Sequence, residues 1–277
     1  MPHLAIAAVA VAALAAALRL PALGEYWLNP DEGIYYSVIA WPDLARRQAE
    51  IAENAHPPFF YHLLWAWSRV SMEFAWLRAL AALAGCVAVL AFLLLGRRIG
   101  AARGGIAVGV AAAVLLAVAP AAVTQARLIR PYALQVALIA FALLGLLTWS
   151  ATRRRGPLAA FSACSAVALL THYSSALALA AGFAPVLVAF ARGALPRAAA
   201  RELGVALVLP AAAAAWIGYA HLGTQLAGSA LHAHAYATWL RPHLAESALH
   251  AWLLFLGFVG YAFGEAWSAS GALAWFA

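Results

Sequence analysis

Lysine is absent from this chain, and Asp and Glu together number only 10 among 277 residues. Charged residues of all kinds amount to 10%, whereas a soluble globular domain carries roughly 25%. So few charges cannot cover a water-exposed surface, and a hydrophobic content of 66% agrees with that. The composition therefore predicts an integral membrane protein and excludes an ordinary soluble domain.

Cysteine is also scarce, since Cys86 and Cys164 are the two thiols of the chain and both lie inside apolar runs. This excludes a disulfide framework and a cysteine-based metal site. The net charge of +7 comes from 17 Arg, which in a soluble protein would suggest a nucleic-acid partner. Here the arginines stand in short clusters between apolar runs, as membrane topology requires, so no nucleic acid is expected.

Long apolar runs are the dominant feature of the sequence. A helix needs ~20 apolar residues to cross a bilayer core, and ~17 are tolerated. We expect one all-α transmembrane domain over residues 1–277, with the uncleaved first run as a span rather than a signal peptide. The apolar end at 267–277 is compatible with part of a ninth span, and hence with a chain that is incomplete at its C-terminus. About eight spans are expected: Leu4–Leu23, Trp76–Leu95, Ile106–Val123, Ala133–Trp149, Leu158–Tyr173, Ser175–Ala191, Gly204–Tyr219 and Leu249–Phe263.

Three arginine clusters set the expected orientation, because they follow the second, fourth and sixth runs. All three fall on one side if every run crosses, and the positive-inside rule makes that side cytoplasmic. The N-terminus is then cytoplasmic too, and the first, third, fifth and seventh connections lie outside the membrane of a bacterial cell. The clusters are Arg97, Arg98 and Arg103, then Arg153, Arg154 and Arg155, then Arg192, Arg197 and Arg201.

The first outer segment, Gly24–Ala75, is unusually long and holds both Asp residues of the chain. Pro42 and Asp43 can begin a helix, because proline suits the first helical position and a carboxylate suits the N-terminal dipole. A second helix is expected to begin at Pro57–Pro58 and to run through Trp67, with many interfacial aromatics. Both helices are expected to lie in the plane of the membrane interface.

Two adjacent carboxylates, Asp31 and Glu32, stand just past the first span, in the pentapeptide Asn-Pro-Asp-Glu-Gly. A carboxylate at a membrane mouth can take a proton from an acceptor hydroxyl. The pair can also bind a divalent cation through oxygen. The third interpretation is a solvated turn, because this pentapeptide has turn chemistry. The residues alone leave all three interpretations open, and they leave the metal dependence unknown.

The second outer segment carries Arg127 and Arg130, which break the positive-inside pattern. A guanidinium is suited to holding two phosphate oxygens in a fixed fork. The alternative is that these residues bind lipid headgroups or pair with loop carboxylates. Acid and cation thus face the same compartment, which is what glycosyl transfer from a lipid phosphate needs.

These segments resemble the GT-C membrane glycosyltransferases that use polyprenyl-phosphate sugars, such as protein O-mannosyltransferases and aminoarabinose transferases. The resemblance covers roughly residues 15–190, and it rests on the order and spacing of four elements. They are Asp31-Glu32 followed by Tyr35-Tyr36, His56-Pro57-Pro58, Arg127-x-x-Arg130-Pro131-Tyr132, and Thr171-His172-Tyr173.

The resemblance implies an inverting transferase with Asp31 as the catalytic base and Glu32 orienting the acceptor or assisting a cation. It implies that Arg130, with Arg127 and Tyr132, binds the donor phosphate. It also implies a cavity lined by Tyr35, His56, His172 and Tyr173, a polyprenyl-phosphate sugar donor, contact with membrane lipids, and a hydroxyl acceptor on protein, lipid or glycan. Many relatives carry Lys or Tyr in place of His172 and a further soluble domain, and this chain departs from them there.

Two other interpretations remain. A polytopic transporter or lipid flippase would do no covalent chemistry, and a GT-C relative that only binds lipid phosphate would serve as an assembly subunit. Transporters place ionisable residues at the span centres within inverted repeats, and neither feature is visible here. Five histidines in or next to the last outer segment suggest either a metal site or ordinary loop residues: His221, His232, His234, His243 and His250.

Overall fold

A computed structural model of the chain describes residues 2–54, 56–102 and 104–223, and every element in that part is a helix. The expected all-α fold is thus confirmed for the described residues. The helices are α1 (Pro2–Arg19), α2 (Pro30–Ala40), α3 (Leu44–Glu53), α4 (Phe59–Ser68), α5 (Phe74–Ile99), α6 (Gly105–Val118), α7 (Pro120–Ala126), α8 (Tyr132–Thr152), α9 (Arg155–Thr171), α10 (Ser175–Ala191), α11 (Arg197–Trp216) and the π-helical η1 (Ile217–Leu222).

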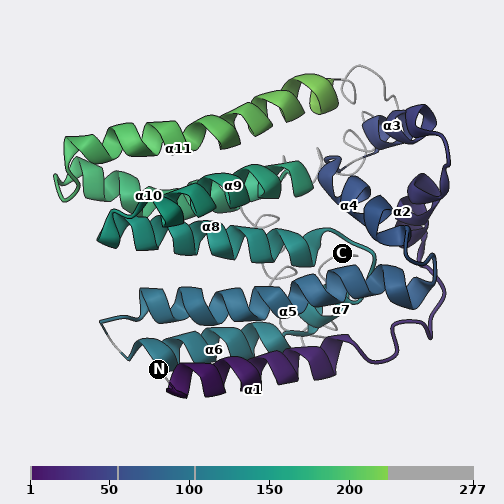
Figure 1. Cartoon of the computed structure of the whole chain (residues 1–277), viewed down its shortest axis with the longest axis horizontal. Helices are drawn as coiled ribbons and strands as arrows, with labels where there is room; N and C mark the ends of the chain where they lie inside the picture. The colour runs from purple at the N-terminus through teal and green to yellow at the C-terminus, as the bar shows by residue number, and fades with distance from the viewer. Residues whose placement is uncertain (1, 55, 103, 224–277) are drawn as a thin grey trace, which may run out of the picture.

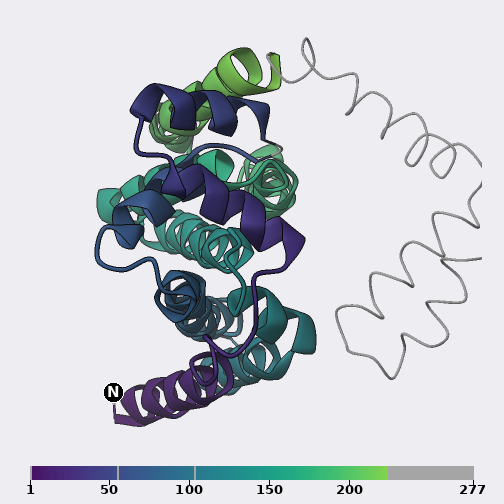
Figure 2. The same cartoon turned by 90° about the vertical axis from the view of Figure 1, so that its right-hand side faces the viewer.

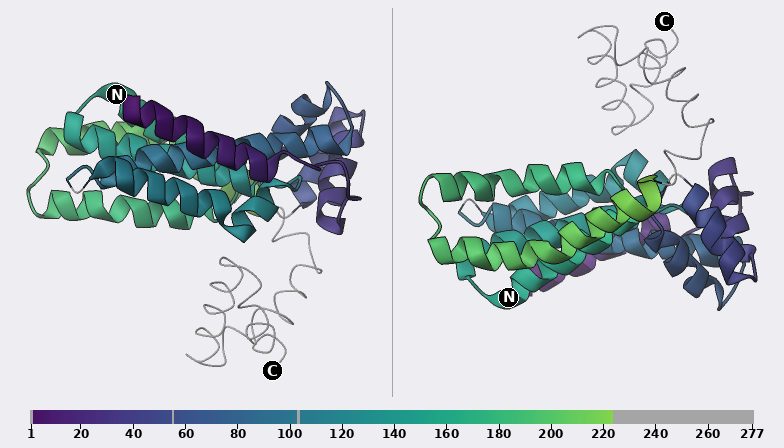
Figure 3. Two further views of the ribbon diagram at one scale, coloured as in Figure 1. Left: turned by 90° about the horizontal axis from the view of Figure 1, so that it is seen from below. Right: turned by 90° about the horizontal axis from the view of Figure 1, so that it is seen from above.

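The long helices run side by side, and α2, α3 and α4 gather at one end of the bundle (Figure 1). Figure 2 looks onto that end, where the three short helices cover the ends of the long ones. Helix α5 packs against α1, α6 and α8, and α9 packs against α8 and α11. The views from below and above in Figure 3 show the same elongated bundle with the short helices at its tip.

Four helices in the described part are long and apolar enough to cross a membrane, namely α1, α5, α8 and the continuous stretch Arg197–Leu222. The pair α6 and α7 makes a fifth if the two count as one span. Helices α9 and α10 are apolar but shorter, at 17 residues each. The sequence predicted seven crossings in this part, and the eighth, Leu249–Phe263, lies outside the described residues.

Small residues allow the long helices to approach one another closely. A Cβ added at Gly145 of α8 would lie 2.9 Å from the backbone nitrogen of Phe161 in α9, and one at Gly96 of α5 would lie 2.9 Å from the Cα of Gly109 in α6. Such approach suits helices that associate by van der Waals packing rather than by the hydrophobic effect. Alanine, which is abundant in the buried core, serves the same purpose.

The third expected span is broken, because α6 and α7 meet at an angle of 64°. Proline lacks an N–H, so Pro120 cannot bond the carbonyl of Leu116 four residues earlier. Buried Arg19 at the end of α1 satisfies this end of α6 instead, by donating to the carbonyl oxygens of Leu116 at 3.0 Å and Ala117 at 2.9 Å. A cation at a helix C-terminus is also favoured by the helix dipole.

The first outer segment folds as helices that share one core. Helices α3 and α4 begin close to the prolines predicted to start them, with Asp43 as the N-cap of α3. The turn interpretation of Asn-Pro-Asp-Glu-Gly is wrong, because Pro30 begins α2 and Asn29 is its N-cap in a reciprocal capping box with Glu32. We call the hydrophobic cluster that these three helices share the outer core. It contains Tyr35, Val38, Ile39, Ile51, Phe60, Tyr61, Leu64, Leu77 and Ile129.

The described arginines of the three clusters lie at the opposite end of the bundle from α2, α3 and α4 (Figure 1). Arg97 and Arg98 close α5, Arg153 joins α8 to α9, and Arg197 opens α11. The two ends of the bundle therefore differ in charge in the way that the sequence predicted.

Candidate active site

Asp31 and Arg130 form an ion pair at the junction of the outer helices and the long bundle. Asp31 lies in the first turn of α2, and Arg130 lies in the short segment between α7 and α8. The Asp31 side chain is 59% exposed, whereas that of Arg130 is only 15% exposed. The structure thus brings the predicted base and the predicted phosphate ligand together, and it also realises the alternative in which Arg130 pairs with a loop carboxylate.

Arg130 lies between two aromatic rings. Its guanidinium carbon is 6.0 Å from the ring centre of Tyr35 and 5.7 Å from that of Tyr132. The electron-rich faces of such rings stabilise a cation. Tyr35 itself is fixed by stacking on Tyr61, with ring centres 4.6 Å apart, and by an edge contact with Phe60. Arg130 is therefore held in place by the outer core before any ligand arrives.

Two histidines complete this cluster. The ring centres of His56 and His172 are 4.9 Å apart, and the His172 ring lies 5.3 Å from that of Tyr132. His56 comes from the connection between α3 and α4, and His172 caps the end of α9. Three of the predicted cavity residues, Tyr35, His56 and His172, thus gather around Arg130, together with the predicted phosphate ligand Tyr132.

Both histidines are held in the neutral form near pH 7. Burial, with the nearby His172 and Arg130, lowers the pKa of His56 to about 4. Burial and Arg130 also lower the pKa of His172. The Nδ1 of His172 accepts hydrogen bonds from the backbone N–H of Ser174 at 3.1 Å and from its hydroxyl at 2.8 Å. Because Nδ1 accepts, the proton of neutral His172 is on Nε2.

Three buried polar atoms of the cluster have no hydrogen-bond partner among the described residues. They are the hydroxyl oxygen of Tyr35, the Nδ1 of His56 and the Nε of Arg130. Buried polar atoms are nearly always hydrogen-bonded in folded proteins. The arrangement is therefore suited to a polar ligand that reaches these atoms.

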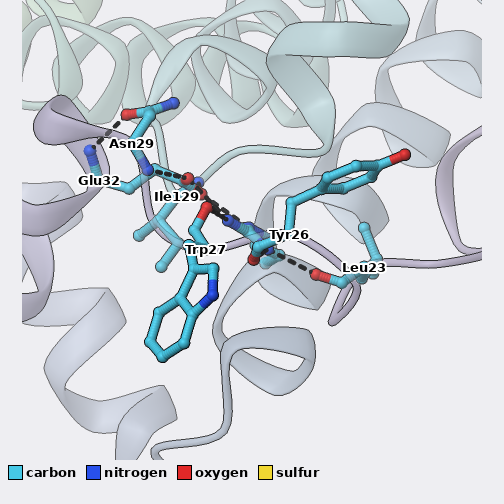
Figure 4. A network of polar contacts seen from close by, with 7 residues as sticks. Leu23, Tyr26, Trp27, Asn29, Glu32 and Ile129 are labelled. Carbon is cyan, nitrogen blue, oxygen red and sulfur yellow. Dashed lines mark hydrogen bonds and ion pairs between the residues drawn. The ribbon is translucent and has the colours of Figure 1, made fainter.

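Glu32 belongs to a buried network of hydrogen bonds, drawn in Figure 4. Its carboxylate accepts two hydrogen bonds from Arg78 of α5, both at 2.8 Å, and one from the backbone N–H of Ile129 at 2.9 Å. Burial alone would raise the pKa of Glu32, but the hydrogen bonds from Arg78, Ile129 and Asn29 outweigh it and hold the pKa below its usual value. Both carboxylate oxygens of Glu32 are occupied by these hydrogen bonds, so neither is open to an acceptor or a cation as predicted.

Arg127 and Tyr173 also have partners outside the cluster. Arg127 donates to the carbonyl of Pro21 at 2.9 Å and lines a separate cavity of about 440 Å³ that Arg78 borders. The Tyr173 hydroxyl bonds Nδ1 of His221, and Nε2 of His221 lies 3.1 Å from the carbonyl oxygen of Ile51. Burial raises the pKa of Tyr173 to about 12. Tyr173 thus ties the α9–α10 turn to η1 and α3.

His221 is a buried helical residue, so its interpretation as an ordinary loop histidine is wrong. The other four histidines of that group, His232, His234, His243 and His250, lie outside the described residues. Within residues 2–54, 56–102 and 104–223, no group of three or more His, Cys, Asp or Glu is arranged to hold a metal ion. A divalent cation stays a prediction.

Sequence reasoning missed two buried arginines, Arg19 and Arg78. The signal was present, because both interrupt stretches that read as apolar spans. A cation inside such a stretch needs a partner or a polar cavity. Arg78 finds Glu32, and Arg19 finds the broken end of α6.

No family model, no curated protein and no solved structure matches this chain. Its function is therefore inferred from its residues and their geometry.

Proposed function

We propose that this chain is a GT-C-type membrane glycosyltransferase that moves a monosaccharide from a polyprenyl-phosphate donor to a hydroxyl acceptor on the extracytoplasmic side. The observation that carries the proposal is the Asp31–Arg130 pair at the tip of an apolar bundle, enclosed by neutral histidines and tyrosines. A general base and a phosphate ligand in contact are the two groups that such a transfer needs.

In the proposed reaction, Asp31 takes the proton of the acceptor hydroxyl. The oxygen of that hydroxyl attacks the anomeric carbon of the donor sugar at the same time. The bond from that carbon to the phosphate oxygen breaks, and its electron pair stays on the polyprenyl phosphate. Arg130 stabilises the charge that develops on the leaving phosphate. Attack from the face opposite the leaving group inverts the anomeric configuration.

The direct Asp31–Arg130 contact gives donor binding a further role. A phosphate that binds Arg130 competes with Asp31 for the same guanidinium. Displacement of Asp31 leaves its exposed carboxylate free to accept a proton. The base would thus be released when the donor is in place.

The neutral histidines fit recognition of sugar hydroxyls. Neutral imidazoles both donate and accept hydrogen bonds, and the unpartnered Nδ1 of His56 is available for this purpose. Beside Tyr132 lies an apolar cavity of about 180 Å³, lined mostly by α5, α7 and α8. Its apolar walls suit the first carbons of a lipid chain that enters from the side.

A transporter is the second candidate, because a broken helix such as α6–α7 is typical of transporters. In those proteins the free helix ends face the substrate. Here the two carbonyls at the end of α6 are occupied by Arg19. This contact favours a structural role for the break, and with it the enzyme over the transporter.

The test is transfer of a radiolabelled sugar from its polyprenyl phosphate in membranes, with wild type and Asp31→Asn at matched expression. We expect Asp31→Asn to abolish transfer and to bind sugar-free polyprenyl phosphate more tightly, because the competing carboxylate is gone. Full transfer by Asp31→Asn would contradict the assignment of the base. Movement of intact donor across the bilayer without cleavage would favour the transporter.

A further inference from the structure

We propose that Glu32 and Arg78 form a buried brace that fixes the relative position of Asp31 and Arg130, which makes them positioning residues. The inference depends on the proposed function for the roles of Asp31 and Arg130. The geometry of the brace stands on its own contacts.

The brace connects the immediate neighbours of the two site residues. Glu32 follows Asp31 in the chain, and Ile129 precedes Arg130. Oε1 of Glu32 accepts the backbone N–H of Ile129 at 2.9 Å. Because consecutive Cα atoms are about 3.8 Å apart, this one bond sets how far α2 stands from the segment that carries Arg130.

Arg78 anchors this bond to the rigid helix α5. A guanidinium has five N–H donors, and two of those of Arg78 bond Glu32. The other three bond the carbonyl oxygens of Leu23, Tyr26 and Trp27 at 2.8, 2.8 and 3.1 Å. Figure 4 shows these carbonyls and the Glu32 carboxylate converging on one point. Arg78 thus holds the connection from α1 to α2 as well as α2 itself.

The brace has no capacity left for chemistry. Each carboxylate oxygen of Glu32 accepts two hydrogen bonds, Oε1 from Arg78 and Ile129, and Oε2 from Arg78 and Asn29. Glu32 is 0% exposed and Arg78 is 3% exposed. Neither side chain has a free atom for an acceptor, a cation or a phosphate. The adjacent acids therefore divide their roles, with Asp31 exposed for chemistry and Glu32 buried for position.

Hydrogen exchange of the full chain in detergent, read by mass spectrometry, tests the brace without any activity. In Glu32→Met/Arg78→Leu, which removes both charges and leaves none unpaired, residues 22–28 and 126–131 should exchange at least about tenfold faster. Glu202→Gln is the matched control, because Glu202 also pairs with an arginine, Arg153, at 2.9 Å. It should leave both segments at the wild-type rate. Wild-type protection of residues 126–131 in the double variant would overturn the brace.

Arg78→Lys gives a second, milder test, because lysine keeps the charge but has only three donors on one nitrogen. We expect faster exchange at residues 22–28 with residues 126–131 still protected, since the Glu32–Ile129 bond remains. Equal protection of residues 22–28 in this variant and in wild type would contradict the anchoring by Arg78.

The pH profile of transfer separates position from catalysis. In Arg78→Lys, a positioning role predicts a lower kcat at every pH with the acidic limb of the pH profile unmoved, because the substitution leaves the base itself unchanged. If Glu32 were the base, a weaker ion pair with residue 78 would raise the pKa of Glu32 and move the acidic limb of the profile to higher pH. That outcome would overturn the proposal. If wild type transfers no sugar at all, the proposed function fails, and hydrogen exchange still decides the brace.

Discussion

At the residue scale, Arg130 is the side chain on which donor binding depends. Its charge and its planar fork both matter for holding a phosphate. We expect Arg130→Gln to lower kcat/KM for the donor by about 10²-fold and Arg130→Lys to lower it by about tenfold, because lysine retains the charge alone. The measurement is donor titration of transfer in membranes.

Arg127 supplies the comparison for Arg130. It belongs to the same segment but bonds the backbone of Pro21 rather than Asp31. Arg127→Gln should therefore lower kcat/KM for the donor by a smaller factor than Arg130→Gln does. An equal loss in both variants would mean that the phosphate site includes both arginines, as the resemblance implies.

His56 links the site to stability at acidic pH. Its pKa is lowered to about 4 by burial, whereas a histidine in an unfolded chain titrates near 6.5. Between these values the unfolded chain binds the extra proton, so the stability contributed by neutral His56 is present above about pH 6.5 and is lost as pH falls toward 4. The unfolding midpoint of wild type in detergent should thus drop between pH 7.5 and 5.0.

His56→Gln tests this assignment, because glutamine does not titrate. We expect its unfolding midpoint to fall less than that of wild type over the same pH interval. The exposed His3 of α1 provides the control, and His3→Gln should keep the full pH response. His172 has a lowered pKa too and contributes with the same sign, so part of the response should persist in His56→Gln. An unchanged response in His56→Gln would place the pH dependence elsewhere.

At the element scale, Arg19 stabilises the break between α6 and α7. Arg19→Leu leaves the carbonyls of Leu116 and Ala117 without their buried donor. We expect a loss of about 2–6 kcal/mol in the free energy of unfolding, because each of the two buried acceptors without a partner costs about 1–3 kcal/mol. Thermal unfolding in detergent would measure it.

Pro120 offers a specific rescue of that loss. Pro120→Ala restores the N–H that can bond the carbonyl of Leu116 within a continuous helix. In the Arg19→Leu background, Pro120→Ala should therefore recover part of the lost stability. A double variant no more stable than Arg19→Leu would show that the carbonyls of the break are not the origin of the loss.

The helices themselves were largely predictable from local signals. Pro42-Asp43 and Pro57-Pro58 marked the starts of α3 and α4 because capping acts within one turn. The break in the third span was visible as Pro120, but its apolar neighbours read as one continuous run. A turn stayed open as one interpretation of the capped start of α2, because the same residue types serve both purposes.

At the scale of the whole molecule, membrane topology predicted one contact of the site and missed another. Asp31 and Arg130 were paired from their shared side of the membrane, and the structure brings them together. The burial of Glu32 was not predicted, because its partner Arg78 stands inside a stretch that the sequence assigns to a membrane span rather than to the outer segment. Local patterns define which residue types are present, but only packing decides which carboxylate stays exposed.

The difference in charge between the two ends of the bundle predicts which way the protein faces in the membrane. The end formed by α2, α3 and α4 carries the candidate site, and the opposite end carries the arginine clusters. Positive charge favours the cytoplasmic side, so the site should face outward. Leu44 of α3 and Ile99 of α5 are exposed at 57% and 65% and mark the two ends. A cysteine at either position, with Cys86 and Cys164 replaced by alanine, reports its side.

In intact cells, a membrane-impermeant maleimide should label Leu44→Cys, and it should label Ile99→Cys only after the membrane is opened. The two variants control for each other, because both positions are exposed to a similar degree. The reverse pattern would turn Asp31 and Arg130 toward the cytoplasm. The proposed transfer on the outer face would then be impossible for this chain, because its acceptor and the sugar of its donor would lie across the bilayer from the base.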